Sequence, residues 1–319
     1  MTGIVRFADD HGTVRTGIAD GSGGIRSLAA PRVADLLRLP LERLRALVED
    51  AAARRPDTDR DSVLVLPPVD GLMELWAAGV TYERSRAARV EESTEQSVYE
   101  RVYEAERPEL FLKALPWRLV TDGEPIAVRE DSELNVPEPE LGLVLNRTGE
   151  TVGYLIVDDV SSRSIEGENP LYLPQAKIYA GSAAVSSAIV PAWEMAAPDA
   201  LEISLVVWRD GAAVYRATTS TSAFHRSPQG LVEHLWRCQP FPDGAVLSTG
   251  TGIVPGLDFT LRAGDTVETA VDGLGSLTNT VSVGRAGHDW LVDALDRPQV
   301  RREHRRTGVQ CQETSVEAK

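Results

Sequence analysis

Cysteine is nearly absent from this chain: its 319 residues include two, Cys238 and Cys311. Two cysteines are too few for a disulfide framework or a thiolate metal site, and such scarcity is typical of a reducing compartment, so we expect a cytoplasmic protein. No apolar run approaches the roughly 20 residues of a membrane-spanning helix. The N-terminal MTGIVRFADD has no basic start followed by an apolar segment, which argues against a signal peptide.

Positive charge is also scarce. Lys and Arg total 33 against 48 Asp and Glu, which gives a net charge of −15. This balance argues against a nucleic-acid or anionic-membrane partner, because a phosphate backbone would be repelled. An anionic small molecule is not excluded, since a bound divalent cation can reverse the local sign. The hydrophobic share of 42% is ordinary for a globular protein of one or two domains.

The pattern of elements divides the chain into three parts. Weak alternation with tight turns over residues 4–28 predicts strands, and helical spacing over 36–53 predicts a helix interrupted at Pro40. We therefore expect a small N-terminal α/β domain over residues 1–68 and a catalytic domain over 69–284. Residues 285–319 are polar without periodicity, so we expect a mostly flexible extension.

The second part contains two kinds of segment, one after the other. Residues 81–107 are rich in Glu, Arg and Ala, which predicts surface helices that are either simply exposed or form a mobile lid over a site. From about residue 110, short β-type runs are broken by Gly, Pro and Asp. Strands this closely spaced predict an α+β protein built on a β-sandwich or closed roll.

Two acidic features stand out against this background. In NVPEPELGLVL, residues 135–145, strand alternation puts Glu138 and Glu140 on one face, roughly 6–7 Å apart, and Leu141 and its apolar neighbours on the other. Two like charges this close are either solvated at a strand end or form half of a metal site. The second feature is the apolar strand GYLIV, which ends at Asp158-Asp159 and is followed by a polar turn.

Taken together, these motifs resemble the fumarylacetoacetate hydrolase family. The resemblance rests on E-x-E followed about twenty residues later by D-x-S-S-R, and it continues through FLKALP, PLYLPQAKIYAG, LSTGTGIVPG and GDTVETAVDGLGSLTNTV. It covers about residues 70–284. It implies a mixed β-sandwich roll and a homo-oligomer, either a dimer or a tetramer. The stretches RPELFLKALP and VPEPELGLVL are most similar to the branch that dehydrates 2-keto-3-deoxy sugar acids.

The resemblance also implies a site. Glu138, Glu140 and Asp159 would bind one divalent cation, Mg²⁺ or Mn²⁺, since all three offer hard oxygen donors. A 2-keto acid would chelate this cation, which would acidify its C3 protons. Lys177 and Glu109 are the candidate acid and base, with either assignment open. The residues expected to contact the substrate are Thr249, Gly250, Thr251, Gln175, Arg163, Thr81 and Ser85.

Two of the departures from the usual family pattern bear on the reaction. Ser85 stands where the water-activating His of the hydrolases would be, and Ser164 stands where an acid is usual. The expected reaction is therefore loss of water from a 2-keto-3-deoxy sugar acid, with a pentonate as first choice and 2-oxoglutarate semialdehyde as product. The alternatives are a hydrolase or decarboxylase of a β-diketo acid such as an acylpyruvate, a member diverted to specialised metabolism, and a non-catalytic scaffold.

Overall fold

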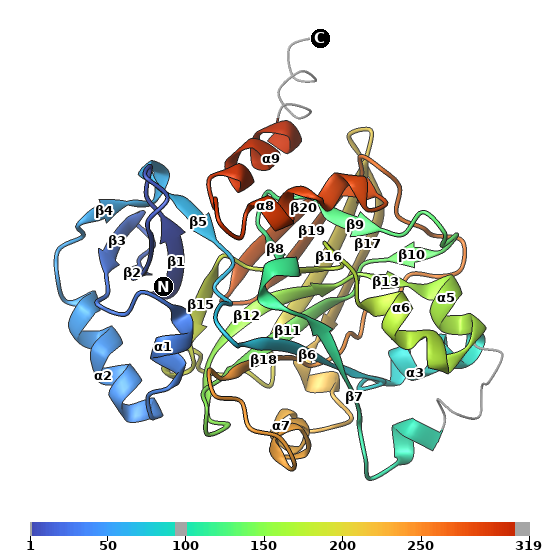
Figure 1. Ribbon diagram of the computed structural model, residues 1–319. Coiled ribbons are helices and arrows are strands. Elements are labelled where there is room, and N and C mark those ends of the chain that lie inside the picture. The colour runs from blue at the N-terminus through green and yellow to red at the C-terminus, as the bar shows by residue number, and fades with distance from the viewer. Residues whose placement is uncertain (1, 93–100, 310–319) are drawn as a thin grey trace.

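The computed structural model describes residues 2–92 and 101–309, and most of its strands lie in one large mixed sheet (Figure 1). The path of this sheet runs β4-β3-β2-β1-β15-β12-β11-β18-β6-β7, with β5, β8 and β14 joined at its sides. Its strands are β1 (Gly3–Ala8), β2 (Val14–Ala19), β3 (Gly24–Ser27), β4 (Thr58–Asp59), β5 (Leu64–Leu66), β6 (Glu74–Gly79), β7 (Glu109–Ala114), β8 (Val120–Thr121), β11 (Pro139–Leu145), β12 (Thr151–Asp159), β14 (Ala183–Val185), β15 (Ala188–Pro191) and β18 (Ala245–Ser248).

A second, five-stranded sheet packs against one face of the first. Leu141, Leu143 and Leu145 of β11 share a buried cluster with Ile203 and Val267 of this sheet. The predicted mixed β-sandwich is therefore confirmed, and so is the predicted core face of β11. The sheet runs β17-β16-β19-β20-β9, with β9 (Ile126–Val128), β16 (Glu202–Arg209), β17 (Ala212–Ser220), β19 (Thr266–Val271) and β20 (Gly275–Val283); β10 (Asn135–Val136) pairs with β13 (Ser161–Ser162).

Helices of the N-terminal part cover the opposite face of the large sheet. Leu37 of α1 (Val33–Leu37) and Val48 of α2 (Leu41–Ala52) share a buried cluster with Val144 of β11. Pro40 separates the two helices, as predicted, because proline lacks the N–H that a continuous helix requires. Strand β11 is thus covered on both faces, which explains why all seven of its residues are buried.

The N-terminal part also joins the large sheet through its strands. β1 pairs with β15, with Ile4 opposite Ile189, so backbone hydrogen bonds run continuously from this part into the catalytic sheet. The domain boundary at residue 68 remains a prediction.

The charged segment and the helices near the site complete this part of the fold. Helix α3 (Glu83–Glu92) lies within the predicted helical segment, whereas residues 93–100 of the expected lid fall outside the described residues. Helices α5 (Arg163–Glu168) and α6 (Leu173–Lys177) follow β13, and α7 (Pro228–Trp236) precedes β18. In the described part of the chain, no helix is both long and apolar enough to cross a membrane.

The prediction of a mostly flexible extension from residue 285 is wrong for the part that the structure describes. Helices α8 (Trp290–Asp293) and α9 (Val300–Val309) lie above the sandwich (Figure 1). Arg301 of α9 is buried and forms an ion pair with the fully buried Glu124 over 2.7 Å. The sequence shows no apolar periodicity here because part of the helix contact is made by arginines. Residues 310–319 lie outside the described range.

Candidate metal centre

Three carboxylates predicted as ligands converge at the meeting point of β11 and β12. Glu138 directly precedes β11, Glu140 is its second residue, and Asp159 ends β12. Antiparallel pairing puts Pro139 opposite Asp158, which brings the acidic ends of both strands together. One oxygen from each of the three carboxylates lies within 4.8 Å of the others, and all three side chains are buried. A solvated strand end is therefore excluded.

Basic side chains hold two of the three carboxylates. Glu138 Oε1 lies 2.5 Å from Arg163 Nη2, and Glu138 Oε2 lies 2.7 Å from Lys177 Nζ. Asp159 Oδ1 lies 2.6 Å from Lys113 Nζ, and Asp159 Oδ2 lies 3.0 Å from Lys177 Nζ. The ammonium of Lys177 therefore bridges two of the candidate ligands.

Glu140 is held differently from the other two. Its Oε2 accepts hydrogen bonds from Ser248 Oγ at 2.5 Å and from the backbone N–H of Gly250 at 2.8 Å. Among the residues that the structure describes, no basic side chain forms an ion pair with it. Burial raises the pKa of Glu140 well above its ordinary value, and repulsion from Asp159 and Glu138 raises it further.

The neighbouring acid Asp158 takes a structural part. Its Oδ1 accepts the backbone N–H of Glu138 at 2.9 Å, which fixes the start of β11 against the end of β12. Burial raises the pKa of Asp158 to about 7.

The donor set fits a hard divalent cation. Three carboxylate oxygens lie close together, and Glu140 is buried beside two like charges with no ion pair to a basic side chain of the described residues. Such an arrangement is costly unless a proton or a cation compensates the charge. Oxygen-only ligation suits Mg²⁺ or Mn²⁺ and is unlike a structural zinc site.

Comparison with known proteins agrees with this geometry. The model of the fumarylacetoacetate (FAA) hydrolase C-terminal family matches residues 76–282. The chain belongs to the fumarylacetoacetate hydrolase family. The match begins in β6 and ends in β20, so it spans the sandwich that carries the carboxylates. The predicted family membership and fold class are thereby confirmed.

Two relatives share much of the sequence. The chain is 47% identical over 253 residues to a probable 2-keto-3-deoxyxylonate dehydratase of Haloferax volcanii, covering 79% of this chain and 86% of the relative. It is 43% identical over 229 residues to a 2-dehydro-3-deoxy-D-arabinonate dehydratase of Saccharolobus solfataricus, covering 70% and 76% of the respective chains.

Solved structures of the family superpose closely on this fold. A 2-keto-3-deoxy-D-arabinonate dehydratase in its apo form aligns with a TM-score of 0.77 at 35% identity, over 89% of this chain and all of the other. The same dehydratase complexed with magnesium and 2,5-dioxopentanoate aligns with a TM-score of 0.76, at the same identity and coverage.

The fold brings several of the predicted site residues to the carboxylates. A small cavity of about 10 Å³ is lined by the three acids together with Lys177, Ser85, Gly250 and Thr251. The same cavity is lined by Gly79, against whose Cα the carboxyl group of Glu109 packs. The amine of Lys177 fills much of the space between the acids, because it pairs with two of them.

Two predicted substrate contacts instead shape the loop after β18. Thr81 Oγ1 donates to the carbonyl of Thr249 at 2.7 Å, and Thr249 Oγ1 donates to the carbonyl of Leu141 at 2.8 Å. Both hydroxyls thereby fix the backbone whose N–H, at Gly250, reaches Glu140. Ser85 Oγ donates to the carbonyl of Tyr82 at 2.8 Å.

Gln175 lies on α6 two residues before Lys177, and its side chain is exposed. It is not among the described residues that line the small cavity, so its contact with substrate stays a prediction. Arg163 reaches the site through Glu138 in the ion pair given above.

Sequence reasoning missed two residues that hold the site together. Lys113 of β7 is fully buried and pairs with Asp159, and Ser248 of β18 donates to Glu140. A lysine inside the apolar run LFLKAL was the available signal for the first, since an unpaired lysine is rarely buried in a strand.

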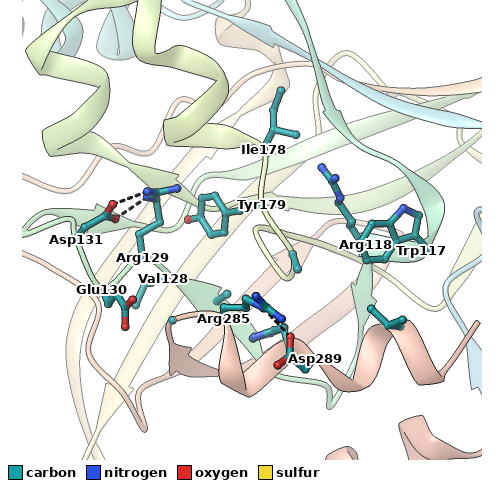
Figure 2. A pocket seen from close by; sticks show the side chains of 15 residues that line it. Trp117, Arg118, Val128, Arg129, Glu130, Asp131, Ile178, Tyr179, Arg285 and Asp289 are labelled. Carbon is teal, nitrogen blue, oxygen red and sulfur yellow. Dashed lines mark hydrogen bonds and ion pairs between the residues drawn. The ribbon is translucent and has the colours of Figure 1, made fainter.

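The two residues that follow Lys177 line a second, larger cavity. Figure 2 shows this cavity of about 530 Å³, with Ile178 and Tyr179 in its wall. Four of its charged side chains form two local pairs, Arg129 with Asp131 and Arg285 with Asp289. The converging carboxylates lie elsewhere, so we assign the candidate site to the smaller cavity, on the basis of its chemistry.

Proposed function

We propose that this protein is a Mg²⁺-dependent dehydratase of a 2-keto-3-deoxy pentonate, with 2-oxoglutarate semialdehyde as the product. The observation that carries the proposal is the buried cluster of Glu138, Glu140 and Asp159 with Lys177 in direct contact. Relatives named as dehydratases of such sugar acids, at 47% and 43% identity, support the choice of substrate.

Glu138, Glu140 and Asp159 would hold the cation. When bound, Mg²⁺ supplies Lewis-acid polarisation of the substrate's keto group and balances its carboxylate. The magnesium complex of the related dehydratase with 2,5-dioxopentanoate supports this assignment. Mn²⁺ has similar ligand preferences and would be able to replace it.

The chain's own residues would move the protons. Lys177 Nζ and the carboxylate of Glu109 are the two candidates, one to take a proton from C3 and the other to protonate the departing C4 hydroxyl. Breaking these two bonds releases water and leaves an unsaturated 2-keto acid. Moving a proton from C5 to C3 then gives an enol, and transfer of its hydroxyl proton to C4 gives the aldehyde. The loop fixed by Thr249 presents Gly250 and Thr251 at the cavity, where they would orient the substrate carboxylate.

Ser85 separates this proposal from the hydrolase alternative. Its hydroxyl is engaged with the backbone of Tyr82, and a serine is a poor general base at neutral pH. A dehydratase requires no attacking water, so the absence of a histidine at this position is compatible with it.

A proton NMR time course tests the proposal. The protein is incubated with Mg²⁺ and 2-keto-3-deoxy-D-arabinonate or its xylonate counterpart, with an acylpyruvate in parallel and EDTA as control. We expect an aldehyde resonance to grow from a sugar acid, and we expect EDTA to abolish it. Lys177→Met and Glu109→Gln should each lower the rate at which this resonance appears by at least 100-fold. Cleavage of the acylpyruvate would instead favour the hydrolase. A protein that binds the metal but converts neither compound would contradict the proposed substrate.

A homo-oligomer, dimer or tetramer, and a cytoplasmic location belong to the same proposal. The family membership and the scarcity of cysteine support them. Light scattering coupled to size-exclusion chromatography tests the first by giving the mass in solution.

A further inference from the structure

Lysine is rare in this chain, and its placement is uneven. Of the 33 basic Lys and Arg residues, three are lysines: Lys113, Lys177 and Lys319. Two of these three lie buried at the candidate metal centre, and the third is the last residue. Arginine serves elsewhere even in buried ion pairs, as Arg301 does with Glu124. Positions 113 and 177 therefore stand out as places where the chain uses an amine.

The ammonium of Lys113 has three partners and no exposed surface. It lies 2.6 Å from Asp159 Oδ1, and it donates to the carbonyls of Val160 at 2.9 Å and Lys177 at 2.8 Å. The two carbonyls accept two of the three donors of this ammonium, and the carboxylate of Asp159 balances its charge. The three acceptors converge on a single nitrogen, which suits a compact ammonium and not the planar fork of arginine.

These contacts join the segments that carry the proposed chemistry. Asp159 and Val160 lie at the end of β12, whereas the Lys177 carbonyl lies at the end of α6. Lys113 itself projects from β7, so one side chain links three elements. Its ion pair with Asp159 Oδ1 leaves Oδ2 to Lys177, and the two contacts together fix the rotation of the carboxylate.

We propose that Lys113 is a positioning residue, which orients the metal ligand Asp159 and holds the main chain of Lys177 relative to it. The inference rests on the proposed metal site and deepens it. Lys113 acts through these two residues and need not touch the substrate. Outer contacts of this kind usually change metal affinity by about 10- to 100-fold when removed.

The competing explanation is that Lys113 supplies only positive charge. The two explanations predict opposite signs for one measurement. Removing a positive charge beside a cation site strengthens binding of a divalent ion, because a repulsion disappears. Removing an orienting contact weakens binding, because the carboxylate no longer points in one direction. Lys177→Met is the matched control, since Lys177 contacts the same Asp159 and occupies ligand oxygens.

The first experiment measures Mn²⁺ binding without substrate, by electron paramagnetic resonance of the free ion. We expect Lys177→Met to bind Mn²⁺ more tightly than the wild type. We expect Lys113→Met to bind it about 10- to 100-fold more weakly. Binding by Lys113→Met that equals or exceeds that of the wild type overturns the inference. Failure of the wild type to bind Mn²⁺ contradicts the metal site, and hence the proposed function, instead.

A second experiment follows the titration in the unaltered protein, and variants serve there to assign the signals. Selective labelling of lysine gives three side-chain signals, which Lys319→Arg and Lys177→Met assign. On titration with Mg²⁺, the Lys113 signal should shift and saturate with the same Kd as the Lys177 signal, while the Lys319 signal stays in place. An unchanged Lys113 signal at saturating Mg²⁺ would show that Asp159 is not linked to it.

Discussion

The backbone N–H of Gly250 donates to Glu140 Oε2 over 2.8 Å, and only glycine fits at this position. The φ angle of Gly250 is +87°, in the left-handed region that side chains rarely adopt. A Cβ there would lie 2.0 Å from Thr81 Oγ1 and 2.8 Å from the carbonyl oxygen of Ala78. One of the candidate metal ligands is thus oriented by a loop whose conformation depends on the missing side chain.

Replacement of Gly250 should therefore damage the metal site. In Gly250→Ala, the loop must move away from Thr81, and Glu140 loses its backbone donor. We expect Mn²⁺ affinity to fall by at least tenfold, together with a lower melting temperature. Gly264→Ala is the control, because Gly264 has the same φ of +87° with nothing within 4 Å of the added Cβ. It should lose about 1–2 kcal/mol of stability and no metal affinity. Equal metal affinity in the two variants would contradict the role of the loop.

Metal binding should depend on pH through Glu140. Burial, with repulsion from Asp159 and Glu138, raises the pKa of Glu140, so the metal-free fold holds a proton that the unfolded chain releases. This contribution favours the metal-free fold at low pH and is lost as pH rises through the raised pKa. Mg²⁺ must displace the proton, so its apparent affinity should increase with pH.

Melting curves with EDTA and with Mg²⁺ test this between pH 5 and 9. The two melting temperatures should move apart as pH rises, and Glu140→Gln should show little metal stabilisation at any pH. A constant separation across the range would contradict the prediction.

A second titrating group, His288, lies two residues before α8. Burial lowers the pKa of His288, whose Nε2 lies 2.9 Å from the carbonyl oxygen of Pro125. The fold therefore favours the neutral ring, and this contribution to stability is lost as pH falls from the ordinary histidine pKa toward the lowered one. Urea unfolding at pH 7 and pH 5 should show a smaller pH-dependent loss in His288→Gln than in the wild type. Replacing the exposed His11 in the same way should leave the loss unchanged.

The C-terminal helix should contribute strongly to stability through one ion pair. Arg301→Met leaves Glu124 buried without its closest basic partner, and breaking a buried pair on one side typically costs about 3–5 kcal/mol. Arg297→Met removes an exposed pair with Asp293 at 3.5 Å and should cost less than about 1 kcal/mol. Chemical denaturation distinguishes the two. Similar losses in both variants would mean that Arg305, which also pairs with Glu124, suffices alone.

Local periodicity was enough to predict one face of β11 but not its surroundings. Alternation correctly assigned Leu141, Leu143 and Leu145 to the core, and it put Glu138 and Glu140 on one side. It could not show that the acids are buried too, because the side chains that contact them, Arg163, Lys177 and Ser248, lie 25 to 108 residues further along the chain. The meeting of these acids with Asp159 depends on strand register, which only the tertiary structure sets.

The residues that escaped prediction share a physical cause. Lys113 and Arg301 are charged groups that become buried only because a carboxylate distant in the sequence compensates them. Single-sequence patterns treat such side chains as solvated, which led to the incorrect expectation for α9. Hydrophobic periodicity carries no information about partners of this kind.

The pairing of β1 with β15 determines where this protein can be cut. Without residues 1–68, Ile189 and its neighbours in β15 would form the open edge of a large apolar sheet. An uncovered edge of this kind is a template for pairing with another chain. A catalytic fragment that begins at residue 69 should therefore aggregate, even though it would contain every residue of the candidate metal centre.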